Sequence, residues 1–207
     1  MKNNNILEEK IITIAKRLFI ERGFDGTSMS DIAAAADINR PTLHYYFRTK
    51  DKMFQAVFQS IVSIVSPSLQ KIFTEEGSFF DKIEKVIDVY ISVFSENPAL
   101  PNFILSEANR DIDHLILTVK TLPLAEYINR AEQMIQKEMK EGRLKEVPIS
   151  TLFLTLYSML IFPFLSKKVL SCMFFENEEE FRIFLLGWKQ NICNQMKALL
   201  EVTPPER

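Results

Sequence analysis

The chain has 207 residues, of which 47% are hydrophobic, enough to build a buried core and too many for a disordered polypeptide. It contains five glycines, and patterns of strand, turn and strand are scarce, so we expect an all-α fold. The formal net charge is −2, but residues 1–50 carry eight Lys/Arg against six Asp/Glu, which directs attention to the amino-terminal part.

The first residues, MKNNNILEEKII, are polar and acidic where a signal peptide needs an apolar segment, so a cytoplasmic protein is expected. The longest apolar run, 151–165, is shorter than the roughly 20 residues of a membrane span and predicts a buried helix and no membrane partner. Cys172 and Cys193 lie in apolar segments, where two buried free thiols are expected. No spacing typical of a metal site or a catalytic nucleophile occurs, so no metal, cofactor or catalytic residue is predicted.

Apolar residues recur at helical spacing over 6–21, after a start expected to be frayed, and Gly23 is the predicted end of this first helix. A short second helix follows. Thr27 or Ser28 is its expected N-cap, and Asp31 suits the positive end of the helix dipole.

A three-residue turn separates the second helix from a third. Asp37 tolerates the left-handed conformation that such a turn requires, and Asn39 is the expected N-cap of the third helix. Pro41 falls in its first turn, where a missing N–H is harmless. Leu43 and Phe47, four residues apart, are predicted to face inward.

Thr49 is the expected cap of a fourth helix, which runs from Lys50 to beyond Val65 and which Pro67 should kink or interrupt. Further helices are predicted near 79–95, 100–109, 112–120, 122–141, 149–170 and 178–201. The tail 203–207 is expected to be disordered.

Two short helices joined by a tight turn form a helix-turn-helix unit, whose second helix enters the major groove of DNA. Arg40, Pro41 and His44 are the candidates for contacting bases. Thr42, Tyr45, Tyr46 and Lys50 are the candidates for contacting phosphates, Lys50 because it begins a helix. Packing of the Tyr45 and Tyr46 rings against the bundle remains an open alternative.

The block GFDGTSMSDIAAAADINRPTLHYYFRTKDKMF resembles the DNA-binding domain of the TetR/AcrR family of transcriptional repressors, over roughly residues 6–55. The residues that carry the resemblance are Thr27, Ser28, Ile32, Ala33, Asp37, Ile38, Asn39, Thr42, Leu43, His44, Tyr46, Phe47 and Lys50. His44 stands where the family commonly has tyrosine, and Ser30 where many relatives carry a longer basic side chain.

The resemblance implies a helix-turn-helix domain over 1–50 and a helical ligand-binding and dimerisation domain over 51–207, with about nine or ten helices in total. It implies DNA contacts by Thr27, Ser28 and Ser30 from the second helix and by Asn39 at the start of the third.

Fourteen of the 17 phenylalanines follow residue 50, which suits an apolar cavity between helices. Phe103, Glu107, His114, Tyr127 and Tyr157 are the candidate ligand-binding residues. Core packing of the aromatic side chains, and an internal ion pair of Glu107 with Arg110 or Arg130, remain open alternatives.

The family forms a four-helix dimer interface from the last two long helices of each subunit. Here these are 149–170 and 178–201, which carry the predicted interface residues Leu152, Leu156, Met159, Leu160, Phe184, Leu185, Trp188 and Ile192. On each of the two helices these residues form an apolar stripe. Both stripes are more apolar than the core of one subunit should need, which favours burial against a partner subunit.

These features together predict a homodimeric repressor that binds a near-palindromic operator and is released by a small, mostly apolar effector. A helical protein-interaction adaptor without sequence-specific DNA binding is the alternative. An enzyme is disfavoured, because the chain has only two histidines and no recognisable catalytic constellation.

Overall fold

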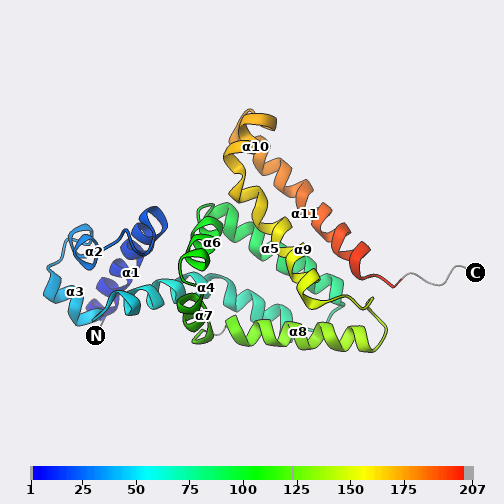
Figure 1. Ribbon diagram of the computed structural model, residues 1–207, viewed down its shortest axis with the longest axis horizontal. Helices are drawn as coiled ribbons and strands as arrows, with labels where there is room; N and C mark the ends of the chain where they lie inside the picture. Colours follow the sequence, from blue (N-terminus) through cyan, green and yellow to red (C-terminus); the bar gives the residue numbers. More distant parts are fainter. Residues whose placement is uncertain (1, 123, 203–207) are drawn as a thin grey trace, which may run out of the picture. The chain divides into compact units, whose positions relative to one another are not determined.

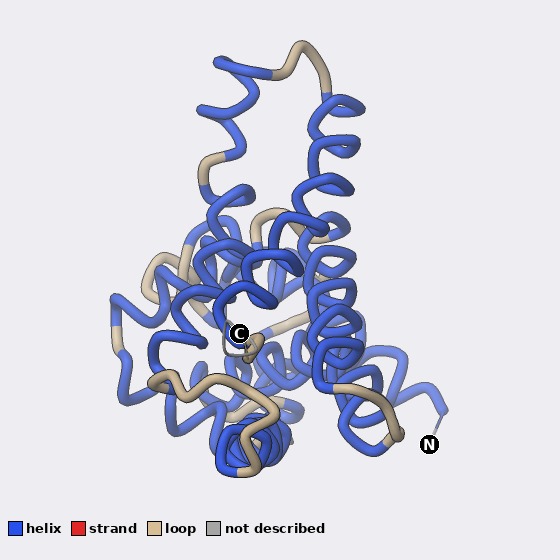
Figure 2. The backbone as a smooth tube through the Cα atoms, turned by 90° about the vertical axis from the view of Figure 1, so that its right-hand side faces the viewer, coloured by secondary structure: helices blue, strands red, loops and turns tan. Residues whose placement is uncertain are grey.

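The computed structural model describes residues 2–122 and 124–202, and within these ranges every regular element is a helix (Figures 1 and 2). The helices are α1 (Lys2–Arg22), α2 (Met29–Ala35), α3 (Arg40–Tyr46), α4 (Lys50–Thr74), α5 (Phe79–Glu96), α6 (Leu100–Arg110), α7 (Ile112–Lys120), α8 (Leu124–Lys140), α9 (Ile149–Leu165), α10 (Lys167–Phe174) and α11 (Glu178–Leu200). The expected all-α class is confirmed. The tail 203–207 lies outside the described residues.

Three helix boundaries differ from expectation. Helix α1 already begins at Lys2, within the stretch expected to be frayed. Helix α4 continues through Pro67, which is exposed, as is Ser63 four residues earlier, so water can replace the hydrogen bond that proline cannot donate. The helix predicted over 149–170 is two helices, α9 and α10, bent by 68° at their junction.

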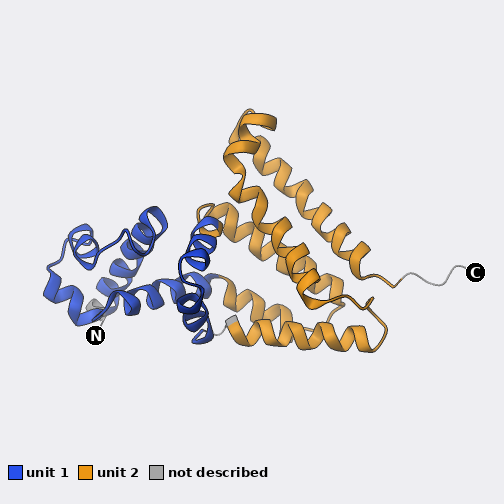
Figure 3. Cartoon of the chain, in the orientation of Figure 1, with its two compact units in different colours: residues 1–64, 102–124 blue, residues 65–101, 125–207 orange. Residues whose placement is uncertain are grey.

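The chain divides into two compact units (Figure 3). Residues 1–64 and 102–124 form the first, which contains α1, α2, α3, the start of α4, most of α6 and all of α7. Residues 65–101 and 125–207 form the second. The domain boundary predicted at residue 50 therefore falls inside the first unit, because the beginning of α4 packs with the amino-terminal helices.

The first unit is organised around an apolar interior shared by its helices. Ile11 and Phe19 from α1, Ile32 from α2, Leu43 from α3 and Phe54 from α4 are all fully buried. The Phe19 and Phe54 rings meet edge to face, with centroids 5.7 Å apart. These contacts fix the position of the short helices α2 and α3, each of which has only seven residues and would not be stable alone.

The second unit has its core where α5, α9 and α11 pack together. This core corrects the predicted dimer interface. Leu152, Leu156, Leu160, Leu185 and Ile192 all belong to the buried interior and are at most 8% exposed. Because a core stripe and an interface stripe have the same apolar character, the sequence pattern alone did not distinguish them. Met159, Phe184 and Trp188 are half-buried and keep part of their surface accessible.

The two cysteines also differ from each other. Cys193 is buried as expected, and burial raises the pKa of its thiol. Cys172 in α10 is exposed, which corrects the expectation of two buried thiols. Helix α10 is only two turns long and contributes no buried residue, so its apolar residues did not indicate a core position.

Among the described helices, α4 is long and apolar enough to cross a membrane, and the bent pair of α9 and α10 passes the same criterion if taken together. Core helices of water-soluble proteins meet this criterion too. In α4, the side chains of Met53, Phe54, Val57 and Phe58 are buried against other parts of the chain.

Pro163 lies inside α9 and has a specific structural partner in α11. Proline has no N–H, so the carbonyl of Met159, four residues earlier, lacks its usual helical donor. The indole N–H of Trp188 donates a hydrogen bond to this carbonyl at 2.9 Å. Trp188 therefore replaces the donor that Pro163 removes and ties α11 to α9.

This arrangement predicts an energetic coupling between the two residues. Trp188→Phe should lower the free energy of unfolding by about 1–3 kcal/mol, because it leaves a partly buried carbonyl without a donor. In a Pro163→Ala background the new backbone N–H of the alanine can donate instead, so the cost of Trp188→Phe should fall by about 1 kcal/mol or more. Urea unfolding of the four proteins in this cycle measures the coupling, and an equal cost in both backgrounds would contradict it.

Candidate nucleic-acid interface

Helix α2 begins with a complete capping box. The Ser28 side chain accepts a hydrogen bond from the Asp31 N–H, and the Asp31 carboxylate accepts from the Ser28 N–H at 2.8 Å. The Ser28 hydroxyl also donates to this carboxylate at 2.5 Å. These bonds, the one from the hydroxyl first, hold the pKa of Asp31 below its usual value. Ser28 is exposed, but its hydroxyl already has partners within the chain.

The turn between α2 and α3 has the predicted left-handed residue. Asp37 has φ of 57°, and its N–H and that of Ile38 donate back to the carbonyls of Ala34 and Ala33 at 3.2 and 3.0 Å. Asn39 then caps α3, with its side-chain oxygen accepting from the Thr42 N–H at 2.8 Å. The turn and the cap together set the direction in which α3 leaves α2.

Helix α3 has one face fixed in the interior and one face open. Leu43 is fully buried, and Phe47, the residue that ends the helix, is nearly so. Arg40, Pro41, His44 and Tyr45 are exposed, and Tyr45 keeps 74% of its surface accessible. At about 100° per residue, Pro41 and Tyr45 point away from Leu43, and Arg40 and His44 lie together on one flank of the helix, so these four exposed side chains form one outward surface, which we call the α3 face.

Of the predicted phosphate-binding residues, Tyr45 lies on the α3 face and the other three border it. Tyr46 is half-buried and its ring meets the Tyr45 ring edge to face at 5.2 Å. Thr42 is half-buried and its hydroxyl donates to the Asn39 side chain at 2.7 Å. Lys50 is the first residue of α4, with its ammonium 4.2 Å from the centre of the Phe24 ring. Thr49 caps this helix as expected, accepting from the Lys52 N–H.

Thr27 requires a correction. It is fully buried, and its hydroxyl donates to the carbonyls of Leu18 and Gly23 at 3.2 and 3.0 Å, so it holds the corner between α1 and α2 and cannot contact DNA. Two adjacent hydroxyl residues precede α2, and nothing local in the sequence shows that Ser28 takes the cap and Thr27 the interior. Ser30, by contrast, is exposed on α2.

A second set of contacts supports this bundle from α6. Glu107 is 2% exposed, and its carboxylate accepts from the Phe24 N–H at 3.1 Å and from the Arg110 Nε at 2.8 Å. The Arg110 guanidinium lies 4.3 Å from the centre of the Phe24 ring. Glu107 therefore joins α6 to the corner between α1 and α2, across 83 residues of sequence. We call Phe24, Glu107, Arg110 and His114 the Glu107 cluster.

His114 on α7 completes the Glu107 cluster. Its ring lies 5.4 Å from the Phe24 ring and 5.0 Å from the Phe54 ring. Arg110 faces its Nδ1 at 3.3 Å, and because arginine can only donate, the imidazole proton is assigned to Nε2. The carboxylate of Asp51 lies 3.5 Å from that nitrogen.

The predicted ligand-binding residues are thus mostly occupied by internal contacts. Phe103 is buried against Phe58, and Glu107 has the Arg110 partner that one of the two interpretations expected. In the second unit Tyr127 is buried, and the Tyr157 hydroxyl donates to that of Tyr90 at 3.3 Å. Burial raises the pKa of both tyrosines of this pair. None of the five predicted residues lines the three cavities described in the second unit, which have volumes of about 720, 580 and 460 Å³.

Comparison with known proteins identifies the family that the amino-terminal part of the chain matches. Residues 11–57 match the family "Bacterial regulatory proteins, tetR family", which confirms the resemblance. The chain is 25% identical over 171 residues to "Probable HTH-type transcriptional regulator YttP" of Bacillus subtilis, covering 79% of this chain and 80% of that protein. It is 25% identical to the negative regulator IcaR of the biofilm operon icaADBC of Staphylococcus epidermidis, covering 56% of this chain and 64% of IcaR.

A solved structure shows the same fold over nearly the whole chain. It is a TetR transcriptional regulator from Chloroflexus aurantiacus, with a TM-score of 0.72 at 18% identity, covering 98% of this chain and 100% of that one. The matched family segment contains α2, α3 and the start of α4, and hence the α3 face with the residues on its border.

The Glu107 cluster predicts a large effect of a substitution far in sequence from the helix-turn-helix. Glu107→Ala should lower the free energy of unfolding by about 2–4 kcal/mol, because it leaves the Phe24 N–H and the Arg110 guanidinium without their buried acceptor. Glu107→Gln keeps an acceptor but no charge and should cost less. Denaturant unfolding measures these losses, with Asn109→Ala, at an exposed position of α6, as a control that stays within about 0.5 kcal/mol. An equally small effect of Glu107→Ala would contradict the role of the cluster.

Proposed function

Because residues 11–57 carry the DNA-binding domain of the TetR family, we propose that this chain is a homodimeric transcriptional repressor that binds a near-palindromic operator and is released by a small ligand. The observation that carries the proposal is the α3 face: an exposed surface of Arg40, Pro41, His44 and Tyr45 on a helix whose other side is fixed by Leu43. A surface helix without a partner has no need of this combination of side chains.

The α3 face suits the major groove of DNA. Arg40 lies in the first turn of α3, is exposed, and can donate two hydrogen bonds to guanine O6 and N7. His44 follows one turn later on the same side, and Pro41 can contact a thymine methyl group. We assign these three residues to base contacts.

Tyr45 on the α3 face and the residues at its border suit the phosphates. Tyr45 and Tyr46 can donate their hydroxyls, and Lys50 adds its charge to the amino-terminal end of the 25-residue helix α4. The Thr42 hydroxyl is directed to Asn39, so Thr42 and Asn39 contribute mainly by fixing the start of α3. Ser28 and Ser30 lie exposed on α2 and complete the proposed contact surface.

We propose that two copies associate through α9 and α11, on the side left open by the core. Phe162 on α9 is 63% exposed, and Phe184 and Trp188 on α11 are half-buried, with their rings stacked 5.7 Å apart. Exposed aromatic surface of this kind is characteristic of interfaces. A dimer also supplies the two α3 helices that successive major grooves of a near-palindromic site require.

We also propose that the protein represses transcription and that binding of a small ligand releases it from DNA. The relative IcaR is named a negative regulator, which favours repression over activation. The second unit contains cavities of about 720 and 580 Å³, each within the range that small ligands occupy. Ligand and operator must then weaken each other's binding to the same degree. The relatives are regulators, and we propose no enzymatic activity for a protein expected in the cytoplasm.

The DNA-binding role predicts distinct effects of two substitutions. Arg40→Ala should reduce affinity for the operator by about 1–3 kcal/mol and relax the preference at one base pair. Lys50→Gln should weaken specific and non-specific DNA alike and lower the salt dependence by about one counterion. Fluorescence anisotropy with DNA from upstream of the protein's own coding region measures both, over a series of salt concentrations.

The control for these measurements is Lys168→Gln, which removes a charge from α10, outside the first unit. It should leave DNA affinity and salt dependence unchanged. An operator affinity unaffected by Arg40→Ala would refute its contact with a base, and salt-independent binding would favour the adaptor interpretation instead.

The dimer interface predicts that a charge at Phe162 separates the subunits. Phe162→Glu should convert the dimer to a monomer in sedimentation-velocity experiments, because it places a charge in an apolar contact. Leu186→Glu is the matched control. Leu186 is 72% exposed on α11 but lines a cavity together with residues of α5, so this variant should remain dimeric. A dimeric Phe162→Glu variant would place the interface elsewhere.

A further inference from the structure

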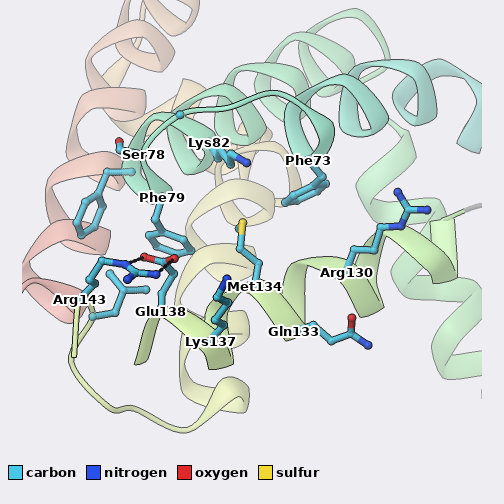
Figure 4. A pocket seen from close by; sticks show the side chains of 13 residues that line it. Phe73, Ser78, Phe79, Lys82, Arg130, Gln133, Met134, Lys137, Glu138 and Arg143 are labelled. Carbon is cyan, nitrogen blue, oxygen red and sulfur yellow. Dashed lines mark hydrogen bonds and ion pairs between the residues drawn. The ribbon is translucent and has the colours of Figure 1, made fainter. Parts of the chain in front are cut away.

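The second unit contains a cavity of about 720 Å³ that is lined by both apolar and charged side chains (Figure 4). Its apolar lining consists of Phe73 from α4, Phe79 and Phe80 from α5, Met134 from α8 and Leu144 from the segment after α8. The Phe79 and Phe80 rings meet edge to face at 5.5 Å. Four separate segments of chain thus supply one apolar surface of a size that suits a small ligand.

The polar lining of this cavity is strongly biased toward positive charge. Lys82, Arg130, Lys137 and Arg143 line it, against the single carboxylate of Glu138. The Arg143 guanidinium donates two hydrogen bonds to Glu138, at 2.7 and 2.6 Å. These bonds hold the pKa of Glu138 below its usual value, so Glu138 stays ionised and bound to Arg143.

The four cations differ in how well the chain itself neutralises them. Arg143 also pairs with Glu141, and Arg130 lies 2.5 Å from Glu126. Lys137 reaches Glu141 only at 4.0 Å. Lys82 is half-buried and has no carboxylate within 4 Å in the described part of the chain.

Lys82 from α5 and Lys137 from α8 both line the cavity, and Figure 4 shows the side chain of Met134 between them in this view. A cation that is partly withdrawn from water and has no anion in contact with it is a favourable position for an anionic group of a ligand. The apolar lining next to it suits an uncharged body or chain.

The second unit also has a cavity of about 580 Å³, whose lining has no such excess of positive charge. It is lined by Lys167, Arg182 and Lys189, but also by four carboxylates. Lys189 pairs with Asp88 at 2.6 Å, and Lys167 with Glu178 at 2.5 Å. Its charges are balanced within the chain, so it gives no preference for an anion.

We propose that the cavity between α4, α5 and α8 binds an amphipathic anion, with an alkyl or aryl body against Phe73, Phe79 and Met134 and an acidic head group at Lys82. A neutral apolar molecule would leave Lys82 without a partner, and a cation would be repelled by the excess positive charge. This inference rests on the proposed function in one respect only, that such a ligand would be the effector that releases DNA. It replaces the mostly apolar effector predicted from the sequence with a charged one.

The test compares three probes of equal chain length by isothermal titration calorimetry: decanoate, decan-1-ol and decyltrimethylammonium. We expect decanoate to bind with Kd of about 10–100 μM, the alcohol more weakly, and the ammonium compound not measurably. Lys82→Gln should weaken decanoate binding about tenfold and leave the alcohol unaffected. Met134→Trp should weaken both, because the larger side chain fills the apolar part of the cavity.

Lys168→Gln is again the matched control, since it removes a lysine of the same unit that lines neither large cavity. The proposal is refuted if wild-type protein does not bind decanoate, if the alcohol binds as tightly, or if Lys82→Gln leaves decanoate affinity unchanged.

Titrating the same proteins with decanoate while they are bound to operator DNA distinguishes a failure of the proposed ligand site from a failure of the proposed function. Binding of decanoate at Lys82 without any change in DNA affinity would keep the site and reject its role as effector site. Absence of specific DNA binding would reject the proposed function, while the calorimetry would still decide the site.

Discussion

The buried carboxylate of Glu107 is the interaction on which the first unit depends. A carboxylate at 2% exposure is stable only if its oxygens are paired, and here one accepts from the Phe24 backbone and the other from Arg110. The first bond fixes the corner that leads from α1 into α2, and the position of α2 determines through Asp37 and Asn39 where α3 lies. The direction of the α3 face is therefore set partly by a buried residue that lies far after it in the sequence.

The amino-terminal helices could be predicted closely because their signals are local. Each cap acts within three or four residues: Asn39 on Thr42, Thr49 on Lys52, and Gly23, with φ of 72°, on the end of α1. The division of α3 into an inner side with Leu43 and Phe47 and an outer side with Pro41 and Tyr45 follows from helical spacing alone. The residues that match the tetR family lie in this part of the chain. The family match and the helical spacing therefore both indicate α3 as the candidate DNA-binding helix.

Interactions between distant segments could not be predicted in the same way. Sequence patterns show that Leu152 and Ile192 are apolar, but not whether a neighbouring helix or a second subunit covers them. They do not show that Trp188 serves the carbonyl freed by Pro163, nor that Thr27 is the buried member of a hydroxyl pair. The cavity at Lys82 was missed for a related reason: its lining comes from four segments, and the lack of a carboxylate near one lysine can only be seen once these segments are placed together.

The first unit is built from two separate segments of the chain, and this affects how it folds during synthesis. The ribosome releases residues 1–64 first, but the unit also needs 102–124, which are synthesised later. At ordinary rates of translation the roughly 40 residues between Ile64 and Glu107 take about 2–9 s, during which Phe24 lacks its carboxylate partner and the apolar side of the nascent bundle is incompletely covered. The first unit should therefore acquire its final geometry only after residues 102–124 have been synthesised, and a chain truncated after α4 should be a poor substitute for the intact unit.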